Sequence, residues 1–413
     1  MFSKMMNERY FCGLDIGSQS IKAGILRIKD RTDINLMGVY EQKTYGFRNN
    51  AVSDLNEFSE CIHRTIEELA EETGVKIKDV FLGIGGALVD ARQTHTAIPL
   101  IDRGNKIITY RDVKKVNDHA RLLGIQMDEE ALHVLPQNYK IDDRNSALNP
   151  LGLYGRKLGV RSLMIIVNSN NIRNISKAVH QAGYDVTDVF FNSFCASEVI
   201  LTEPEKKEGC VLLDIGAQYS TGLVFSDGVM QYLEGVPIGG DHFTHHIAQQ
   251  MGLPFEMAEE IKKSYAVACG FDQYEHEEIL VKKEDAYVPV KRGLISQAIK
   301  SEVEGFVRWL GNMIAHAGIN SRLKGGIVVI GGGGLLSGLI ERIEQDLQQS
   351  VKFGQLNLPL RRNLNYTALF SSVVGLARGG YKKTLRHSLS AGSRHHWAKQ
   401  FSNRIKELYH EYF

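Results

Sequence analysis

Two stretches of the chain share one pattern of apolar and polar positions. Each is an apolar run that ends in Leu-Asp-Ile-Gly and is followed, after a short polar turn, by a second apolar run. The first is FCGLDIGSQSIKAGIL at 11–26 and the second is CVLLDIGAQYSTGLVF at 210–225. Such a pattern is typical of a β-hairpin with a glycine turn. Its repetition predicts a chain made of two halves with one plan.

A third glycine-rich stretch, GGIVVIGGGGLLSGLIERI at 325–343, has a different order of elements. A short apolar strand at 327–330 runs into four glycines, and apolar positions at helical spacing follow. A helix start with bare backbone is a favourable place for a nucleotide. The glycines do not have the spacing of a dinucleotide-binding fingerprint, and no Gly-Lys-Ser/Thr marks a P-loop. The three glycine turns together therefore suggest another kind of nucleotide fold.

The chemistry of these turns favours phosphate binding. Glycine lets backbone N–H groups converge on an anion, and a nearby aspartate can hold a magnesium ion through its water shell. A single copy fits an ordinary hairpin equally well. Because the chain has two copies, we favour a pair of hairpins that grip one polyphosphate.

The pattern between the glycine turns predicts further elements. A helix at 55–72 ends at Gly74, and a buried strand follows at 80–84. Residues 85–161 indicate an inserted α+β module with a helix near 113–123 and strands at 94–99 and 134–141. We expect the main sheet to resume at 163–167, followed by a helix at 172–182 and a strand at 186–191.

The second half contains its own predicted insertion. A strand at 230–237 leads to Gly239 and Gly240. Residues 255–323 indicate an inserted subdomain with a charged helix at 256–265, a hairpin at 279–290 and a long helix at 294–319. Residues 382–396 are rich in Ser, His, Lys and Arg without periodicity, and we interpret them as a flexible linker.

Composition narrows the class of protein. A length of 413 residues predicts about two or three domains. Of these residues, 43% are hydrophobic and 23% are charged, which is typical of a globular protein. A net charge of +1 argues against a nucleic-acid partner. Five cysteines without CxxC pairs favour reduced thiols in a cytoplasmic protein. No signal peptide or membrane-spanning stretch is present in the pattern, so we expect any membrane contact to be peripheral.

The motifs resemble those of a known superfamily. LDIGSQS and LDIGAQYS are similar to the two phosphate motifs, and VVIGGGGLLSGL to the adenosine motif, of the actin, Hsp70 and sugar-kinase superfamily. Within it the chain most resembles the bacterial cell-division family FtsA, through VLPQNYKID at 134–142, NPLGLYG at 149–155, VPIGGDHFTHHIAQQMG at 236–252 and AEEIK at 258–262. The resemblance covers almost the whole chain.

The resemblance implies an α/β, actin-like (ribonuclease H-like) fold of two domains. It divides the chain into a first domain at 1–84 and 162–205 with a returning helix at 366–381, an inserted FtsA-type subdomain at 85–161, a second domain at 206–254 and 324–365 with an inserted subdomain at 255–323, a linker at 382–396 and an amphipathic membrane-targeting helix at 397–413.

The resemblance also implies that ATP and Mg²⁺ bind between the domains. Asp15 and Asp214 would hold the metal through water. The implied nucleotide-binding residues are Asp15, Gly17, Ser18, Gln19, Ser20, Lys22, Asp214, Gly216, Ala217, Gln218, Tyr219, Gly239, Gly240, Glu259, Lys262, Gly331, Gly332, Gly333, Gly334 and Leu335.

The second phosphate motif departs from the family pattern. Where relatives usually have several glycines, this chain has Ala217, Gln218 and Tyr219, whose side chains leave less room for a phosphate. Relatives that hydrolyse ATP rapidly place Gln or Glu where Ser193 stands in our alignment, with Glu198 one helical turn beyond. We therefore expect no residue suited to rapid catalysis, and at most a slow ATPase.

The implied role is that of a division protein on the cytoplasmic side of the membrane, at the division site. The implied partners are the C-terminal tail of the tubulin-like protein FtsZ, bound by 255–323, other copies in filaments, and other division proteins. In 397–413, the apolar positions Trp397, Phe401, Ile405, Leu408, Tyr412 and Phe413 fall on one helical face. Such a face can lie in a membrane surface. Alternatively, it packs on the protein itself or on another copy.

Two other readings stay open at this point. A small-molecule kinase of the superfamily would use a carboxylate in the cleft as base, but it has no use for a terminal helix. A pilus-assembly actin homologue would share the inserted module and normally lack that helix. His242 and His246 have the i, i+4 spacing of metal ligands, but no third ligand is evident, which favours surface or interface histidines.

Overall fold

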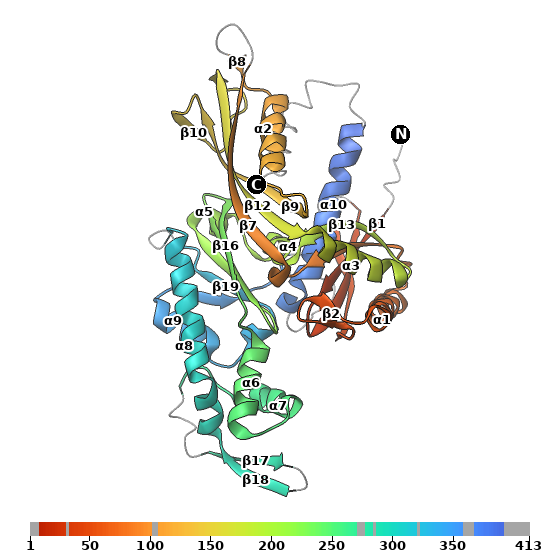
Figure 1. Cartoon of the computed structure of the whole chain (residues 1–413), viewed down its shortest axis with the longest axis vertical. Coiled ribbons are helices and arrows are strands. Elements are labelled where there is room, and N and C mark those ends of the chain that lie inside the picture. Colours follow the sequence, from red (N-terminus) through yellow and green to blue (C-terminus); the bar gives the residue numbers. More distant parts are fainter. Residues whose placement is uncertain are drawn as a thin grey trace.

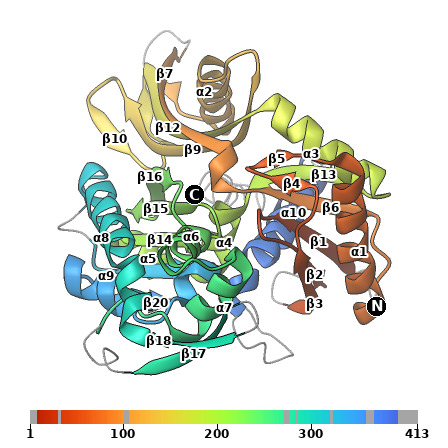
Figure 2. The ribbon, with the colours of Figure 1, turned by 60° about the horizontal axis from the view of Figure 1, so that its bottom comes forward.

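The computed structural model describes residues 8–29, 33–100, 106–270, 277–283, 286–319, 323–357 and 367–391. Two five-stranded sheets stand side by side, each with helices around it, and a further module lies over both (Figures 1 and 2). The elements of the first half are β1 (Arg9–Ile16), β2 (Ser20–Ile28), β3 (Ile34–Lys43), β4 (Phe47–Arg48), β5 (Ala51–Val52), α1 (Leu55–Thr73), β6 (Asp79–Ile84), α3 (Ser169–Gln181), β13 (Asp185–Phe191), α4 (Asn192–Ile200) and α5 (Glu203–Glu208).

The first sheet has the strand order β13-β6-β1-β2-β3. Strands β1, β2 and β3 form an antiparallel meander, and β6 and β13 extend the sheet in parallel on the other side of β1. Helix α1 packs on this sheet through an apolar face that includes Phe58, Ile62 and Leu69. Asp54 caps its first turn, and Gly74 ends it in the left-handed conformation. The predicted bounds of this helix are confirmed within one residue.

The second sheet repeats the plan of the first. Its order is β16-β15-β14-β19-β20, with an antiparallel meander followed by two parallel strands. Its elements are β14 (Cys210–Ile215), β15 (Ser220–Ser226), β16 (Val229–Val236), α6 (Gly240–Met251), β19 (Ile327–Ile330), the 3-10 turn η4 (Gly332–Leu335), α9 (Leu339–Leu347) and β20 (Val351–Phe353). The two hairpins predicted from the Leu-Asp-Ile-Gly repeat are thus β1–β2 and β14–β15, in corresponding places of the two sheets.

An inserted module follows β6, as predicted. It comprises η1 (Gly86–Leu88), β7 (Val89–Pro99), β8 (Lys106–Ile107), α2 (Tyr110–Leu123), β9 (Glu129–Ile141), β10 (Asn145–Ala147), β11 (Tyr154–Gly155) and β12 (Lys157–Asn168). Helix α2 covers a four-stranded sheet of order β10-β9-β12-β7 and closes a separate small core with it. In Figure 1 this module forms the upper end of the molecule.

Strand β12 corrects one expectation. Residues 163–167 do not resume the main sheet, because β12 pairs along its whole length with β7 and β9. The alternate side chains Leu163, Ile165 and Val167 nevertheless lie in the core of the first domain. An apolar run shows that a strand is buried, but it does not show which neighbour the backbone pairs with. The main sheet resumes only at β13.

The second inserted subdomain lies at the opposite end of the molecule (Figure 1). It contains α7 (Phe255–Tyr265), β17 (Glu278–Lys283), β18 (Ala286–Lys291) and α8 (Arg292–His316), as the sequence predicts. Strands β17 and β18 pair as an antiparallel hairpin. Helix α8 buries Ile299, Val303 and Phe306 in a core that it shares with the second sheet, so this subdomain is packed firmly onto its domain.

The last described elements are η5 (Thr367–Phe370) and α10 (Ser371–Ala391). Helix α10 returns to the first domain, as predicted, and packs on β1, β2 and α4. It continues through Ala391, so 382–391 is helical where we expected a flexible linker. Lys382 forms an ion pair with Glu198, and Lys383 with Asp188, which gives these polar residues partners on the first domain. Residues 392–396 and the expected membrane helix at 397–413 lie outside the described residues.

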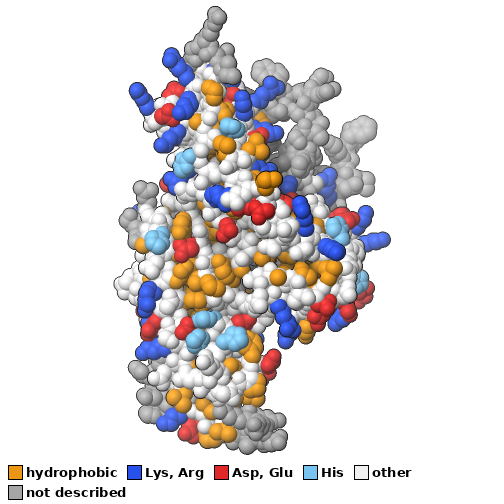
Figure 3. All heavy atoms as spheres, viewed as in Figure 1, with side chains coloured by type: hydrophobic (Ala, Val, Ile, Leu, Met, Phe, Trp, Pro, Cys, Tyr) orange, Lys and Arg blue, Asp and Glu red, His pale blue; other side chains and the backbone are white. Residues whose placement is uncertain are grey.

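The helices, the surface charges and the cysteines each have one general feature. None of the helices in the described ranges is long and apolar enough to cross a membrane. On the face shown in Figure 3, basic and acidic side chains are interspersed. The five cysteines are free thiols, and four of them are buried. Burial raises the pKa of Cys12 to about 12, which keeps this thiol protonated and unreactive.

Candidate functional site

The site is a cavity of about 490 Å³ between the two halves, closed by the glycine turns of both sheets. It is lined by residues of β1, β2, η1, α4, β14, β15, α6, α7, η4 and the start of α10. The residues that the sequence assigned to nucleotide and that line the cavity are Asp15, Gly17, Ser18, Gln19, Ser20, Lys22, Asp214, Gly216, Ala217, Gln218, Tyr219, Gly240, Glu259, Lys262, Gly331, Gly332, Gly333 and Leu335.

Two assigned glycines lie behind the cavity wall instead. A Cβ on Gly239 would stand 2.5 Å from the carbonyl oxygen of Ala217, so the absence of a side chain lets α6 begin directly against the second hairpin turn. Gly334 is buried, and a Cβ there would meet Val329 at 2.6 Å. These two residues shape the site through backbone packing rather than as part of its lining.

The first hairpin turn is held rigidly. The N–H of Gly17 donates to the carbonyl oxygen of Ser20 at 3.0 Å, which closes the turn between β1 and β2. Thr44 donates from Oγ1 to the carbonyl oxygen of Gly17 at 2.7 Å. Ser18 donates from Oγ to Asn50 Oδ1 at 3.2 Å. The turn is therefore supported by Thr44, which directly follows β3, and by Asn50, which lies between β4 and β5.

Asp15, at the end of β1, is held by two neutral donors. Asn192 donates from Nδ2 to Asp15 Oδ1 at 2.9 Å, and Ser372 donates from Oγ to Asp15 Oδ2. These donors come from the first turns of α4 and α10. Nearby, Lys22 donates from Nζ to the carbonyl oxygen of Leu369 at 3.0 Å. Both oxygens of Asp15 thus accept hydrogen bonds from neutral groups, and these bonds orient the carboxylate.

Asp214, at the end of β14, occupies the corresponding place in the second half. Ser193 donates from Oγ to Asp214 Oδ2 at 2.7 Å. Burial raises the pKa of Asp214 above its ordinary value, and the charge of Asp15 adds to this, while the Ser193 hydrogen bond acts in the opposite direction. A buried carboxylate with a raised pKa is a favourable place for a cation.

The second hairpin turn is joined to the start of α6. The N–H of Gly216 donates to the carbonyl oxygen of Tyr219 at 3.0 Å, repeating the bond of the first turn. The N–H groups of Gly240 and Asp241 donate to the carbonyl oxygens of Gly216 and Ala217 at 3.0 and 2.7 Å. The side chain of Gln218 hydrogen-bonds to Asp241, so it is directed toward α6.

Tyr219 packs sideways rather than over the turn. Its ring lies against Gly235 of β16, where an added Cβ would be 2.3 Å from Cε1. The ring also lies near Gly86 at the start of the inserted module, where an added Cβ would be 3.4 Å from Cδ1 of Tyr219. The non-glycine residues of this turn therefore contact α6 and the opposite wall of the cleft.

The third glycine turn needs its glycines for conformation and space. Gly331 has φ 85°, and a Cβ there would stand 2.4 Å from the carbonyl oxygen of Ile215. A Cβ on Gly332 would meet nothing within 4 Å, so this residue borders open space in the cavity. The chain then forms the 3-10 turn η4 before α9, rather than entering the helix directly.

Glu259 and Lys262 of α7 border the cavity as a pair. Lys262 Nζ lies 2.7 Å from Glu259 Oε2 and donates to the carbonyl oxygen of Gly240 at 2.9 Å. Burial alone would raise the pKa of Glu259, but hydrogen bonds from Lys262 and Thr244 outweigh it and lower the pKa. The pair thus ties the inserted subdomain to the start of α6.

Comparison with known sequences identifies the family. A family profile described as cell division protein FtsA matches residues 211–375, and one described as an SHS2 domain inserted in FTSA matches residues 86–166. Together they cover more than half of the chain. The chain belongs to the FtsA family. A cell division protein FtsA from Pseudomonas aeruginosa is 26% identical over 384 residues, which are 92% of this chain and 91% of that protein.

Solved structures show the actin-like fold. A chain of a PilM–PilN type IV pilus biogenesis complex superposes with a TM-score of 0.65 at 16% identity, covering 90% of this chain and 98% of that one. MreB5 of Spiroplasma citri bound to ADP superposes with a TM-score of 0.54 at 12% identity, covering 93% and 99%. These identities show the fold alone. The family profiles favour the FtsA assignment over the pilus-assembly alternative, with which the chain shares that fold.

Some residues of the FtsA site were missed by sequence reasoning. Asn192, Ser372 and Asp241 line the cavity, and the first two position Asp15. Asn192 and Ser372 belong to no glycine motif, and only the proximity of α4 and α10 to β1 in space reveals them. Asp241 directly follows Gly239 and Gly240, so its place beside a glycine turn could have indicated it. Ser193 lies in the site as aligned. Glu198, one helical turn further along α4, instead forms ion pairs with Lys206 and Lys382 at 2.6 and 2.7 Å.

Proposed function

We propose that this FtsA-family protein binds ATP with Mg²⁺ between its two domains. The observation that carries the proposal is that both Leu-Asp-Ile-Gly turns and the glycine turn at η4 converge on one cavity. Gly17, Ser18, Gly216 and Ala217 would line the phosphates, and the stretch from Gly332 to Leu335 would lie beside the adenosine. Bound ATP would supply the polyphosphate that joins the two turns.

The donor set suits a magnesium complex of a polyphosphate. Asp15, Asp214 and Asp241 bring carboxylate oxygens to the cavity, and these are the ligands that Mg²⁺ prefers, commonly through water. A polyphosphate without a cation would be repelled by these groups. Lys22, at the cavity wall, adds positive charge on the side of the first domain. Asp15 and Asp214 are therefore the residues to which we assign the hydrated metal.

We propose that nucleotide acts mainly as a structural ligand that closes the cleft. Ser193 is buried, and its hydroxyl is committed to Asp214, so it is poorly placed to orient an attacking water. Glu198 is held by two lysines away from this role. Turnover should accordingly stay well below about 1 per second, the lower end of ordinary enzyme rates.

We propose further that the protein polymerises and anchors the FtsZ ring to the cytoplasmic membrane at the division site, together with other division proteins. The FtsA assignment supports this role. The subdomain at 255–323 would bind the FtsZ C-terminal tail, since short tails commonly dock in grooves or against helices. The segment 397–413 would lie in the membrane surface, and polymerisation would strengthen its weak single contacts by multivalency.

Nucleotide binding is tested best at Gly332. Because an added Cβ meets nothing within 4 Å, we expect Gly332→Val to keep the fold while it fills space in the cavity. Calorimetry on the purified full chain should detect MgATP binding to wild type and a loss of at least about tenfold in the variant. Gly305→Ala, on α8 with equally open surroundings, is the control and should bind as wild type does. No binding to wild type at millimolar ATP would refute the proposal.

A further inference from the structure

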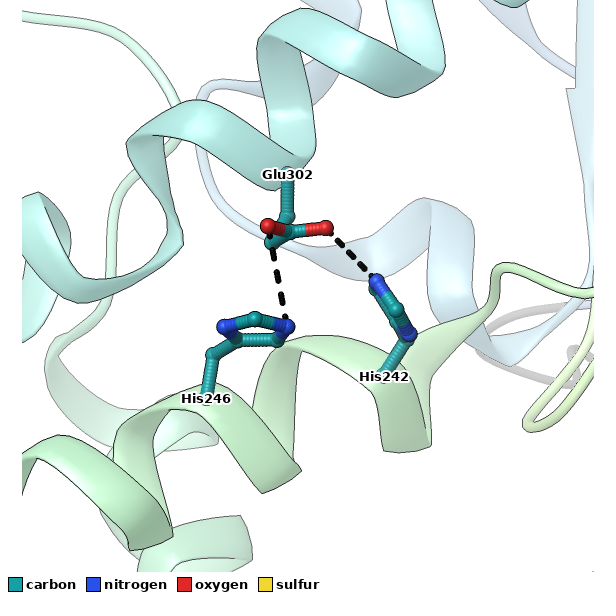
Figure 4. A group of neighbouring side chains, drawn as sticks. All are labelled: His242, His246 and Glu302. Carbon is teal, nitrogen blue, oxygen red and sulfur yellow. Dashed lines mark hydrogen bonds and ion pairs between the residues drawn. The ribbon is translucent and has the colours of Figure 1, made fainter.

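Helices α6 and α8 bring together two histidines and one glutamate. His242 and His246 lie one turn apart on α6, and Glu302 reaches them from α8 (Figure 4). His242 Nε2 lies 2.7 Å from Glu302 Oε2, and His246 Nε2 lies 3.6 Å from Glu302 Oε1. The two histidines have metal-ligand spacing in the sequence, where no third ligand was evident. The third ligand is sixty residues away in sequence and adjacent in space.

The three side chains have the separation that a small metal ion requires. One nitrogen of each imidazole and one carboxylate oxygen all lie within 4.8 Å of one another. A tetrahedral zinc ion with bonds of about 2.0–2.1 Å holds its ligand atoms roughly 3.3 Å apart. Both histidines direct the same ring nitrogen toward the carboxylate (Figure 4). Small side-chain rotations are therefore enough to place three ligand atoms around one centre.

The surroundings suit a cation that keeps one water ligand. The side chains of His242, His246 and Glu302 are 33%, 35% and 25% exposed, so solvent can reach the centre. Ser301 donates from Oγ to Glu302 Oε1 at 3.3 Å and leaves Oε2 toward His242. Two neutral imidazoles and one carboxylate give a ligand set with a single negative charge.

We propose that His242, His246 and Glu302 bind a divalent transition-metal ion of the zinc class, with water as the fourth ligand. Two imidazole nitrogens and a carboxylate form a ligand set that zinc uses in known sites. Without metal, the Nε2–H groups can donate to Glu302. On binding, each imidazole carries its proton on Nδ1, and the Nε2 lone pair faces the metal. This exchange of tautomers is open to the half-exposed rings through water.

The bound ion would join the inserted subdomain to the nucleotide cleft. Helix α6 begins at Gly240, whose N–H holds the second hairpin turn, and α8 is the long helix of the inserted subdomain. A metal between them fixes α8 relative to that turn. The site uses none of the residues assigned to ATP, so it is independent of the proposed nucleotide function.

The test is zinc titration of the purified full chain after treatment with a chelator. Calorimetry should give one Zn²⁺ per chain, and Co²⁺ should give the visible absorption of a four-coordinate site. His242→Ala and His246→Ala should each weaken zinc binding at least about 100-fold, since even outer-shell changes at metal sites cost 10–100-fold. Glu302→Gln keeps a hydrogen-bond acceptor for both histidines and should also weaken binding.

Controls separate this site from other zinc ligands and from misfolding. His245→Ala removes an exposed histidine of the same helix and should leave zinc affinity unchanged. Zinc should raise the melting temperature of wild type and of His245→Ala, and leave that of His242→Ala unchanged. Magnesium, which prefers oxygen ligands, should not displace the bound zinc. Absence of one-to-one zinc binding, or equal binding by His242→Ala and wild type, would overturn the proposal and leave a helix–helix ion pair.

Discussion

Ser193 Oγ donates a hydrogen bond of 2.7 Å to Asp214 Oδ2, and this bond crosses from the first domain to the second. The preceding residue, Asn192, donates to Asp15 of the first hairpin. The first two residues of α4 therefore contact the aspartates of both hairpins. The start of α4 therefore links the aspartate of the first domain to the aspartate of the second.

Ser193→Ala should weaken MgATP binding at least about tenfold. The change removes a hydrogen bond to a charged group, worth about 1.5–3 kcal/mol, and lets the pKa of Asp214 rise further. Calorimetry measures the affinity. Ser197→Ala is the matched control, because Ser197 is equally buried on α4 and donates to the carbonyl oxygen of Phe194, away from the site. Equal affinities in the two variants would contradict the role given to Ser193.

Asp214→Asn should stabilise the nucleotide-free protein at neutral pH and weaken MgATP binding. The folded pKa of Asp214 is raised, so below about pH 4 the residue is neutral in both states and burial costs little. As pH rises through the folded pKa, the buried charge lowers stability. Asparagine removes this cost and can still accept from Ser193.

Melting temperatures at several pH values check this expectation. The gain of Asp214→Asn over wild type should be small near pH 4 and larger at pH 7.5. A gain that does not change with pH would show that the charge of Asp214 is not the cause. Loss of MgATP affinity in the same variant separates the stability effect from the function of the carboxylate.

Lys206→Met should lower the free energy of unfolding by about 3 kcal/mol. Lys206 is buried, and its Nζ lies 2.6 Å from Glu198 Oε1. The variant therefore leaves the carboxylate of Glu198 with only Lys382 of its two lysine partners. Burial alone would raise the pKa of Glu198, but the two lysines lower it well below its usual range. Urea denaturation followed by circular dichroism measures the change. Lys207→Met, at the exposed neighbour, should be within about 0.5 kcal/mol of wild type.

Gly375→Ala should destabilise the contact between α10 and α4. An added Cβ would stand 2.1 Å from the carbonyl oxygen of Cys195, so the two helices must separate, at a cost of about 1–3 kcal/mol or more. Gly379→Ala, one turn further along, meets only ordinary contacts from 3.7 Å and should stabilise the helix by roughly 0.5–1 kcal/mol. Thermal melting of both variants gives the comparison; a shift in the same direction would argue against the close approach.

Trp397→Glu with Phe401→Glu should abolish co-sedimentation with liposomes while ATP binding stays unchanged. The proposed helix depends on its apolar face, because three Lys/Arg against two Glu give little attraction to anionic lipid. Asn403→Glu with His410→Glu adds the same charge on the polar face and should retain most binding. If the apolar-face variant still sediments, this segment packs elsewhere and is not the membrane contact.

The sequence predicted the parts of this fold that depend on local pattern. The hairpin turns at Gly17 and Gly216, helix α1 with its end at Gly74, and both insertions follow from periodicity and glycine chemistry. Strand β12 was placed in the wrong sheet, because an apolar run does not specify its backbone partner. Residues 382–391 lack apolar periodicity, yet they extend α10 and include the ion pairs of Lys382 and Lys383 with the first domain.

In the candidate site too, the residues within one turn were predictable from the sequence, and the residues from distant segments were not. Glycines and aspartates within one turn could be assigned from sequence, since a single hairpin places them. Asn192 and Ser372 could not, because they reach Asp15 from 177 and 357 residues away. Glu302 was missed for the same reason. Contacts between distant segments depend on how helices pack on the sheets, which no local spacing specifies.

The length of α10 has a mechanical consequence for the proposed anchor. Helix α10 is described through Ala391, so five residues at 392–396 lie between that point and the proposed membrane segment, and five residues span at most about 18 Å. The proposed membrane segment would therefore begin close to the described end of α10. The first turn of α10 lies beside Asp15, and the helix extends toward the end of the molecule that carries the module at 85–161, away from the β17–β18 hairpin (Figure 1). The membrane attachment that we propose at this end would leave the β17–β18 hairpin as the part of the molecule farthest from the bilayer.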